Sequence, residues 1–311
     1  MRAVTLFLLV FLFVTCKRDK PVTPVSDCQT YTFEDSPFGP EITMADVTYH
    51  SPCFNPNNKD EIIYIKNNNI SGKAELRKRN LLTKEDNFLA AAWVLNSPRW
   101  HKNGWIVFDY NYNIYKVKEN GDSLTRLTNE GQSYFPSWNI NGSAVIFRRV
   151  DESPWPNLNI IDNNGNLIQV LDSTIGGHRT TSWSPVENKI AYNRHKGIGL
   201  SFVDQKQLGE VKDVTNHELG ILSLSWFSNG EWITWASLFQ FGKTNINTGE
   251  TKILRQGCYA LRYSRPAVSP DDTKIIVERD DIRKTGPSSG YQETYLYIMN
   301  ADGSNEKKIE F

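Results

Sequence analysis

A unit of about forty residues recurs along most of this chain. One copy starts at Phe135–Phe147, where a short apolar run ends on Trp138, an Asn/Gly turn reverses the chain, and a β-branched run follows. This order predicts two antiparallel strands joined by a tight turn. A second predicted hairpin follows, in which Leu158–Asp162 and Leu167–Leu171 flank a turn of Asn and Gly. The two hairpins together predict one four-stranded antiparallel unit.

Each unit carries a marker, a large apolar residue placed directly before a turn rich in Asn, Gly, Pro or Ser. Six markers are present, spaced 38 to 46 residues apart. They are Phe54, Trp100, Trp138, Trp183, Trp226 and Val268. A period near forty residues with four strands per copy is typical of propeller blades. The sequence therefore predicts an all-β protein, a six-bladed β-propeller of four-stranded antiparallel blades.

The marker residues are expected to lie between blades. Each antiparallel blade has two apolar faces and cannot cover both alone, so neighbouring blades must stack. Since all six copies have four strands of their own, we expect the ring to close mainly by packing of the first blade on the sixth.

Four short segments resemble the repeat of the TolB-like six-bladed propellers, which runs Pro-x-Trp-Ser-Pro-Asp-Gly and later Asp-x-Asp-Gly. They are Pro136–Trp138, Trp183–Pro185, Ser269–Asp271 and Asn300–Gly303. The resemblance covers roughly residues 50–311. It implies a propeller of the bacterial cell envelope that binds other proteins. TolB carries an α/β domain before its propeller, whereas we expect only a tether of about thirty residues here.

The start of the chain predicts export. Arg2 precedes the apolar run Ala3–Thr15, whose thirteen residues are too few to span a membrane but suit a signal peptide, residues 1–15. Cys16 follows directly, as in the bacterial lipoprotein signal, in which this cysteine becomes the lipidated first residue. We therefore expect a protein anchored by lipid at Cys16, in the periplasm or on the outer surface. A plain secreted protein that is cut elsewhere is the alternative.

Three segments follow from this pattern: the signal peptide, a tether at residues 16–48, and the propeller at residues 49–311. The tether is rich in Pro, Ser, Thr and Asp. Within it Gln29–Phe33 alternates polar and aromatic residues and is a candidate edge strand for a blade. We expect a monomer.

Three further cysteines, Cys28, Cys53 and Cys258, follow Cys16 in a compartment that permits disulfides. A bridge between two of them is one interpretation and three free thiols is the other, and the sequence does not choose the pair. No Cys-x-x-Cys spacing is present, so we expect no structural zinc. The chain has 35 basic and 35 acidic residues, which gives no basic field for nucleic acid.

Candidate binding residues follow from strand direction. In a four-stranded antiparallel blade the second-to-third loops and the blade-to-blade connections share one face, here called the irregular face, which includes Asp151–Pro156 and a predicted long loop at Asp280–Glu293. Residues expected to rim the central channel on this face are His50, Tyr134, His178, Arg179, Ser264 and Arg265. Trp155 and Tyr291 are expected as exposed aromatic residues that anchor an interface.

Catalytic signals are weak. Gly286–Gly290 matches the letters Gly-x-Ser-x-Gly, but a nucleophile elbow needs a strand before it and a helix after it, whereas a Tyr- and Thr-rich strand is predicted to follow. The five histidines show no metal-binding spacing, although His50 and His178 could converge across the channel. We expect no cofactor and no metal.

The sequence thus favours a membrane-anchored, non-catalytic propeller that binds an envelope protein through its irregular face and channel mouth. The alternative is an envelope protein that binds or cleaves polysaccharide, with His50 and His178 as base or metal ligands. Some pectin-fragment lyases resemble this fold.

Overall fold

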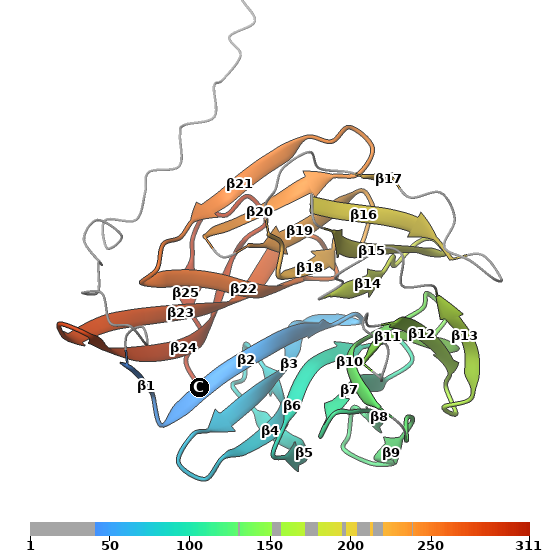
Figure 1. Cartoon of the computed structure of the whole chain (residues 1–311), viewed down its shortest axis with the longest axis horizontal. Coiled ribbons are helices and arrows are strands. Elements are labelled where there is room, and N and C mark those ends of the chain that lie inside the picture. Colours follow the sequence, from blue (N-terminus) through green and yellow to red (C-terminus); the bar gives the residue numbers. More distant parts are fainter. Residues whose placement is uncertain are drawn as a thin grey trace, which may run out of the picture.

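The computed structural model describes residues 41–129, 131–150, 157–171, 180–194, 197–203, 212–213, 220–237 and 239–311. All regular elements within these ranges are β-strands, and none is a helix that could cross a membrane. The strands form six sheets that follow one another in chain order around a ring (Figure 1). The all-β, six-bladed propeller expected from the repeat is confirmed.

Each blade uses four consecutive strands. Blade 1 contains β2 (Val47–Asn55), β3 (Asn58–Asn68), β4 (Lys73–Asn80) and β5 (Asp86–Ala92). Blade 2 contains β6 (Leu95–Trp100), β7 (Trp105–Tyr110), β8 (Asn113–Lys118) and β9 (Thr125–Arg126). Blade 3 contains β10 (Gln132–Trp138), β11 (Ala144–Val150), β12 (Asn157–Asp162) and β13 (Leu167–Leu171).

The second half of the ring repeats this order. Blade 4 contains β14 (Thr181–Trp183), β15 (Lys189–Arg194), β16 (Gly197–Phe202) and β17 (Lys212–Asp213). Blade 5 contains β18 (Ser223–Trp226), β19 (Trp232–Ala236), β20 (Gln240–Asn245) and β21 (Thr251–Gln256). Blade 6 contains β22 (Leu261–Val268), β23 (Lys274–Gly286), β24 (Ser289–Asn300) and β25 (Lys307–Lys308). Within each blade the consecutive strands pair antiparallel.

The first strand of each blade lies innermost. Each of these strands contacts the first strand of the next blade, and β22 contacts β2, so the inner strands surround a central channel. Six clusters of buried apolar side chains separate the blades, one at each interface. Trp138, for example, packs between Val107 of blade 2 and Val145 of blade 3. The five aromatic markers are all buried between blades, as expected.

The ring closes mainly by packing of blade 1 on blade 6. Phe54 and Ile62 of blade 1 share a cluster with Ala267 and Ile276 of blade 6, and neither blade lends a strand to the other within the described ranges. This confirms the mode of closure expected from the four strands of each repeat. Phe311 extends the contact, because its ring stacks on that of Tyr49 with centroids 4.0 Å apart.

One added strand lies outside the six repeats. Strand β1 (Glu41–Met44) pairs parallel with Ser289–Gln292 at the start of β24, while β25 pairs with the later part of β24. Blade 6 is therefore the blade that gains an edge strand. The candidate edge strand at Gln29–Phe33 lies outside the described residues.

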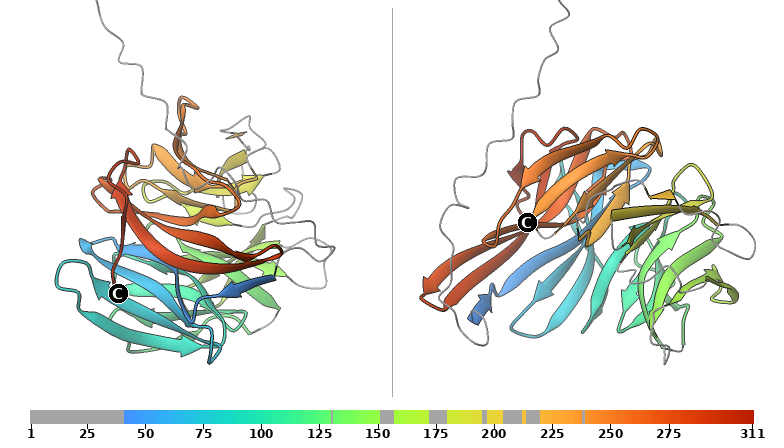
Figure 2. Two further views of the ribbon diagram at one scale, coloured as in Figure 1. Left: turned by 90° about the vertical axis from the view of Figure 1, so that its left-hand side faces the viewer. Right: turned by 45° about the horizontal axis from the view of Figure 1, so that its top comes forward.

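The predicted loop at Asp280–Glu293 is wrong. Strands β23 and β24 pair continuously through this segment up to Gly286 and Ser289 and form one long hairpin (Figure 2). Ile282 is buried on it, and Asp280 accepts a hydrogen bond from Thr294 across it at 2.7 Å. The Gly-x-Ser-x-Gly letters therefore occupy a tight turn between two strands, where no helix follows to build a nucleophile elbow.

Candidate functional site

A bulge recurs at the same place on four inner strands. The strand pairing shifts where Ser51, Ser97, Phe135 and Arg265 each precede a proline. These four residues have positive φ angles of 51°, 51°, 55° and 47°. Proline cannot donate to the ladder, and a left-handed residue bends the strand, so the pairing breaks there. The consequence is visible at Ser51, whose backbone N–H donates to the side chain of Glu278 at 3.0 Å.

These bulges surround the irregular-face end of the channel, which holds a cavity of about 480 Å³. This channel-mouth cavity is large enough for a small molecule or a short peptide segment. Its lining combines three arginines and two carboxylates with serine hydroxyls. The arginines are Arg99, Arg148 and Arg265, the carboxylates are Glu278 and Asp280, and Ser51 is one of the serines.

Glu278, on β23, pairs with several side chains on one side of this cavity. It is only 4% exposed, and Nη1 of Arg265 donates to its two oxygens at 2.7 and 2.9 Å. Ser264 donates at 3.1 Å and Nδ1 of His50 lies 3.3 Å away. Arg265 and His50 hold the pKa of Glu278 well below its usual range, against the effect of burial.

Asp109, on β7, lies on another side of the channel and is 1% exposed. Neither carboxyl oxygen has a side-chain or backbone hydrogen bond of good geometry in the described structure. Burial therefore raises its pKa well above the usual value, and the Phe135 backbone N–H and the charges of Arg99 and Arg265 offset this only in part. An acidic group held in this way resists ionisation.

Four polar residues lie at the same position of the repeat, on the second strand of their blades. The pattern of the inner strands alone does not reveal this position. Asp109, Arg148, Asn193 and Glu278 follow the marker of their blade by nine or ten residues, and each comes directly after a run of three or four apolar residues in the second strand. Asp109, Arg148 and Glu278 each lie opposite the residue just before the bulge of the first strand, and Asn193 accepts a hydrogen bond from the backbone N–H of Thr180. A polar residue at this fixed offset was the signal that could have identified them.

The predicted rim residues and exposed aromatic residues lie in different places. His50, Ser264 and Arg265 come together around Glu278. Tyr134 lies across the ring on blade 3, where its hydroxyl donates to Gln132 at 2.6 Å. Tyr291 is half-buried in the long hairpin between Thr43 and Arg283 and does not line the cavity. Trp155, His178 and Arg179 lie outside the described residues.

Aromatic side chains gather beside the mouth on blades 1 to 3. Trp93, in the connection from blade 1 to blade 2, is 65% exposed, and Tyr112, in the β7–β8 turn, is 46% exposed. The backbone N–H of Asn111 donates to the carbonyl of Val94 at 2.9 Å, and the N–H of Val94 donates to Oδ1 of Asn111 at 3.1 Å, which brings these segments together. The ring of Tyr112 contacts that of Tyr134 edge-on at 6.1 Å. We call Trp93, Tyr112 and Tyr134 the aromatic strip.

Tyr112 is held in an unfavourable backbone conformation. Both central residues of its turn, Asn111 and Tyr112, have positive φ angles, 45° and 64°. Asn and Gly are the usual residues in such a turn, and a bulky side chain in this region is uncommon. The fold therefore keeps an exposed aromatic residue at a position where a smaller one would be more stable.

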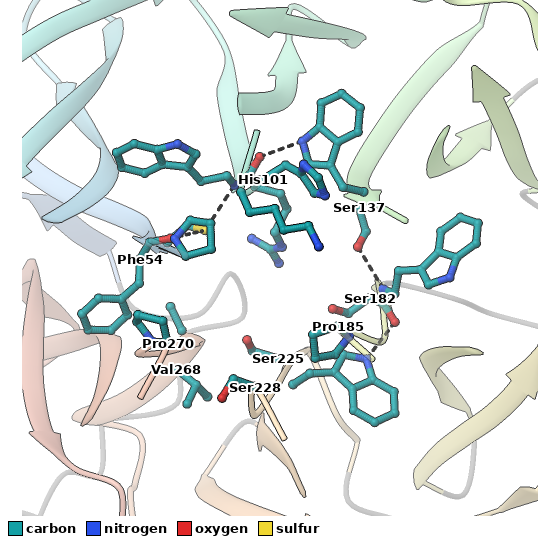
Figure 3. A pocket seen from close by; sticks show the side chains of 18 of the residues that line it. Phe54, His101, Ser137, Ser182, Pro185, Ser225, Ser228, Val268 and Pro270 are labelled. Atoms are coloured by element: carbon teal, nitrogen blue, oxygen red, sulfur yellow. Dashed lines mark hydrogen bonds between the residues drawn. The ribbon is translucent and has the colours of Figure 1, made fainter. Parts of the chain in front are cut away.

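A second cavity, of about 310 Å³, opens at the other end of the channel (Figure 3). Its walls are the marker residues and the regular turns that follow them. Hydrogen bonds tie adjacent blades together there: Ser137 Oγ accepts from the backbone of Trp183 at 2.9 Å, and Trp138 donates to the carbonyl of Arg99 at 3.2 Å. Arg99 lines both cavities and so lies between them.

Two of the three candidate disulfide cysteines fall within the described residues. Cys53 is a free thiol and Cys258 is disulfide-bonded. Cys53 is therefore not a member of the pair, while Cys28 lies outside the described residues. Burial raises the pKa of the Cys53 thiol, which makes it a weak nucleophile.

Comparison with solved structures places this fold among known propellers. It is similar to TolB from Acinetobacter baumannii, with a TM-score of 0.61 and 16% sequence identity over 85% of this chain and 63% of that chain. The chain thus spans less than two thirds of the length of that TolB. No protein-family model matches the sequence, and no curated protein matches it.

Two further propellers are similar. A calcium-binding protein, regucalcin, from Agrobacterium tumefaciens has a TM-score of 0.56 and 13% identity over 76% of this chain and 86% of its own. An oligogalacturonate lyase in complex with manganese has a TM-score of 0.53 and 14% identity over 85% of this chain and 78% of its own. At these identities the similarity concerns the fold.

The names of these two proteins mention a divalent cation, calcium in one and manganese in the other. The described residues of the channel do not have the composition of a cation site. Within the ranges that the structure covers, no three His, Cys, Asp or Glu side chains gather as a metal site. Both oxygens of Glu278 face Arg265, and the arginines of the cavity would repel a cation.

Proposed function

We propose that this TolB-like propeller is a membrane-anchored protein of the bacterial cell envelope that binds a protein partner through its irregular face and channel mouth. The anchor would be a lipid on Cys16, which the signal-like start of the chain supports. The fold shared with TolB supports the envelope setting. The proposal concerns binding and includes no catalytic step.

The observation that carries the proposal is the aromatic strip beside the channel mouth. Exposed Trp and Tyr residues are typical anchors of protein interfaces, because they bury a large area at a small cost in conformational entropy. The strip lies on the face where loop content varies between blades, and Phe135, the chain neighbour of Tyr134, lines the cavity that is rich in charged and hydroxyl groups. An apolar patch rimmed by polar residues is the usual composition of a binding surface.

The strip can be tested by cross-linked capture from the native envelope. The double variant Trp93→Ala, Tyr112→Ala is compared with the parent protein and with Phe88→Ala, a 55% exposed aromatic on the outer strand β5. We expect one protein to be captured by the parent and by the Phe88 variant, with at least a tenfold loss in the double variant, since each anchor contributes about 1 kcal/mol or more.

Equal capture by all three proteins would remove the strip from the interface. Failure to capture any protein, together with binding of pectin fragments by the purified chain, would instead favour the polysaccharide function. The anchor has its own test, because Cys16→Ser should move the protein from the membrane fraction to the soluble fraction.

A further inference from the structure

We infer that the channel-mouth cavity binds a carboxylate, held between the guanidinium groups of Arg99 and Arg265. The inference rests on the proposed function and deepens it, because it names the chemistry that a partner would insert into the channel. An acidic side chain of the partner is the source that we favour. A free small carboxylic acid has the same chemistry, and the choice of probes distinguishes the two.

Arg99 is the first reason. It lies in the middle of the channel and lines both cavities, yet within the described residues it forms no ion pair. The one hydrogen bond that its side chain makes there goes from Nη1 to the carbonyl of its neighbour Pro98 at 3.0 Å. A cation enclosed by protein is costly unless an anion pairs with it. The fold therefore maintains a positive charge in the channel that no group of the described structure neutralises.

Arg265 is the second reason. Its Nη1 is engaged by Glu278, whereas its Nη2 and Nε make no hydrogen bond within the described part of the chain. Arg99 and Arg265 lie close enough that the charge of Arg265 lowers the pKa of Arg99, after the larger effect of burial. Two guanidinium groups thus present free N–H groups to one cavity, which is a favourable arrangement for binding a carboxylate.

The carboxylates already present do not neutralise this pair. Glu278 is saturated by Arg265, Ser264, Ser51 and His50. Asp280 accepts from Thr294 and pairs with Arg262 at 3.4 Å. Asp109 is held in a setting that favours its neutral form. The acidic groups near the cavity are thus occupied by other partners or resist ionisation.

A buried hydroxyl completes the site. Ser51, at the bulge of β2, lines the cavity, and its buried Oγ has no hydrogen-bond partner in the structure as described. A hydroxyl without a partner is a donor that a carboxylate oxygen would satisfy. At about 480 Å³ the cavity accepts an acidic side chain together with the backbone that carries it.

Calorimetry on the purified protein tests the inference without the partner. The probes are glutarate and its uncharged analogue glutaramide, followed by a short peptide containing Glu-Glu and the same peptide containing Gln-Gln. We expect each acidic probe to bind and each amide probe not to bind, with affinity that falls as salt is added. A peptide that binds more tightly than glutarate identifies an acidic chain as the ligand, and equal affinity identifies the free acid.

Arg99→Gln is the decisive variant, because Arg99 supports no ion pair in the described structure whose loss would disturb the fold. It should weaken glutarate binding at least tenfold, about 1.4 kcal/mol. Asp109→Asn removes a potential negative charge and should bind at least as tightly as the parent. The control is Arg126→Gln, the same change on the outer strand β9 of the same blade, which should leave binding unchanged.

The inference fails if glutarate and glutaramide give the same heat, or if the Arg99 and Arg126 variants bind glutarate equally. Either result leaves the aromatic strip untouched, because the strip is tested by capture of a protein. Conversely, carboxylate binding by a protein that captures no partner would support the site and contradict the proposed function.

Discussion

Single residues in the channel combine structural and binding roles. Glu278 shows this most clearly, because one buried carboxylate joins the bulges of β2 and β22 on the two sides of the ring closure. The backbone of Ser51 belongs to blade 1, whereas Arg265 and Ser264 belong to blade 6. The residue that shapes the channel mouth therefore also ties the first blade to the last.

The stability of this site should depend on pH. Glu278→Gln should lower the free energy of unfolding by about 1–3 kcal/mol at pH 7, since it removes a buried carboxylate that pairs with Arg265, whose side chain is 38% exposed. The folded pKa of Glu278 lies below its ordinary value of 4.5, so the carboxylate stabilises above that pH and loses its effect as the pH falls further. The difference from the parent should therefore shrink progressively as the pH falls below about 4.5 in denaturant titrations.

The matched control is Glu293→Gln on the same hairpin, which breaks the solvent-exposed pair with Arg283. Exposed pairs contribute about 0–1 kcal/mol, so this variant should unfold close to the parent. Equal losses for the two variants would show that enclosure of Glu278 adds nothing to its pairing.

At the scale of elements, the sequence predicted the turns and strands that depend on residues close together in the chain. Asn/Gly turns and the regular marker residues identified the blades, since turn type and strand alternation depend on neighbours along the chain. The long hairpin was missed because Gly286 and a run of charged residues were interpreted as a loop, although pairing with β24 keeps the charged residues in β23. Strand β1, which pairs with the other side of β24, is distant in sequence, and periodicity does not show it.

The channel site was missed for a related reason. His50 and Arg265 were found as residues near the start of inner strands, whereas Asp109 and Glu278 lie on second strands, which were considered only for their apolar residues. Each bulge has a residue with a positive φ angle directly before a proline, and the type of residue at that position differs between the strands. Serine, phenylalanine and arginine all occupy it here.

A prediction at the scale of elements concerns the packing of the marker residues between blades. Trp138→Ala should reduce the free energy of unfolding by about 3–5 kcal/mol, because it opens a cavity between blades 2 and 3 and removes the hydrogen bond to Arg99. Trp93→Ala, which truncates an exposed indole, should cost less than about 1 kcal/mol. Denaturant titration compares the two, and similar losses would contradict the packing role of the markers.

The whole molecule depends on a closure without strand exchange. Apolar packing of Phe54 and Ile62 against Ala267 and Ile276 joins the ends of the ring. Phe311 covers this joint: its ring stacks on Tyr49, and Arg79 reaches the carbonyl of Glu310 at 2.6 Å. Blade 1 thus receives the last residues of the sequence shown as part of its surface.

Loss of the Phe311 ring should loosen the joint between blades 1 and 6 more than the other contacts between blades. Phe311→Ala should cost about 1–3 kcal/mol, less than a fully buried Phe because the ring is half-buried. Hydrogen exchange should then rise in β2 and β22 while blades 3 and 4 keep their protection. Phe88→Ala, an exposed ring on blade 1, should leave exchange unchanged, and a uniform rise around the ring would contradict a local joint.

The same closure bears on how the protein is made. The four repeat strands of each blade come from one continuous stretch of chain, so their contacts with one another are short in sequence and favour rapid formation. Blades can therefore assemble in the order in which they emerge during synthesis, each covering the apolar face of the one before it. The face of blade 1 that carries Phe54 and Ile62 is the exception, because it stays uncovered until blade 6 arrives. A chain that lacks blade 6 exposes this apolar face, on which other chains can aggregate, and the completed ring buries it.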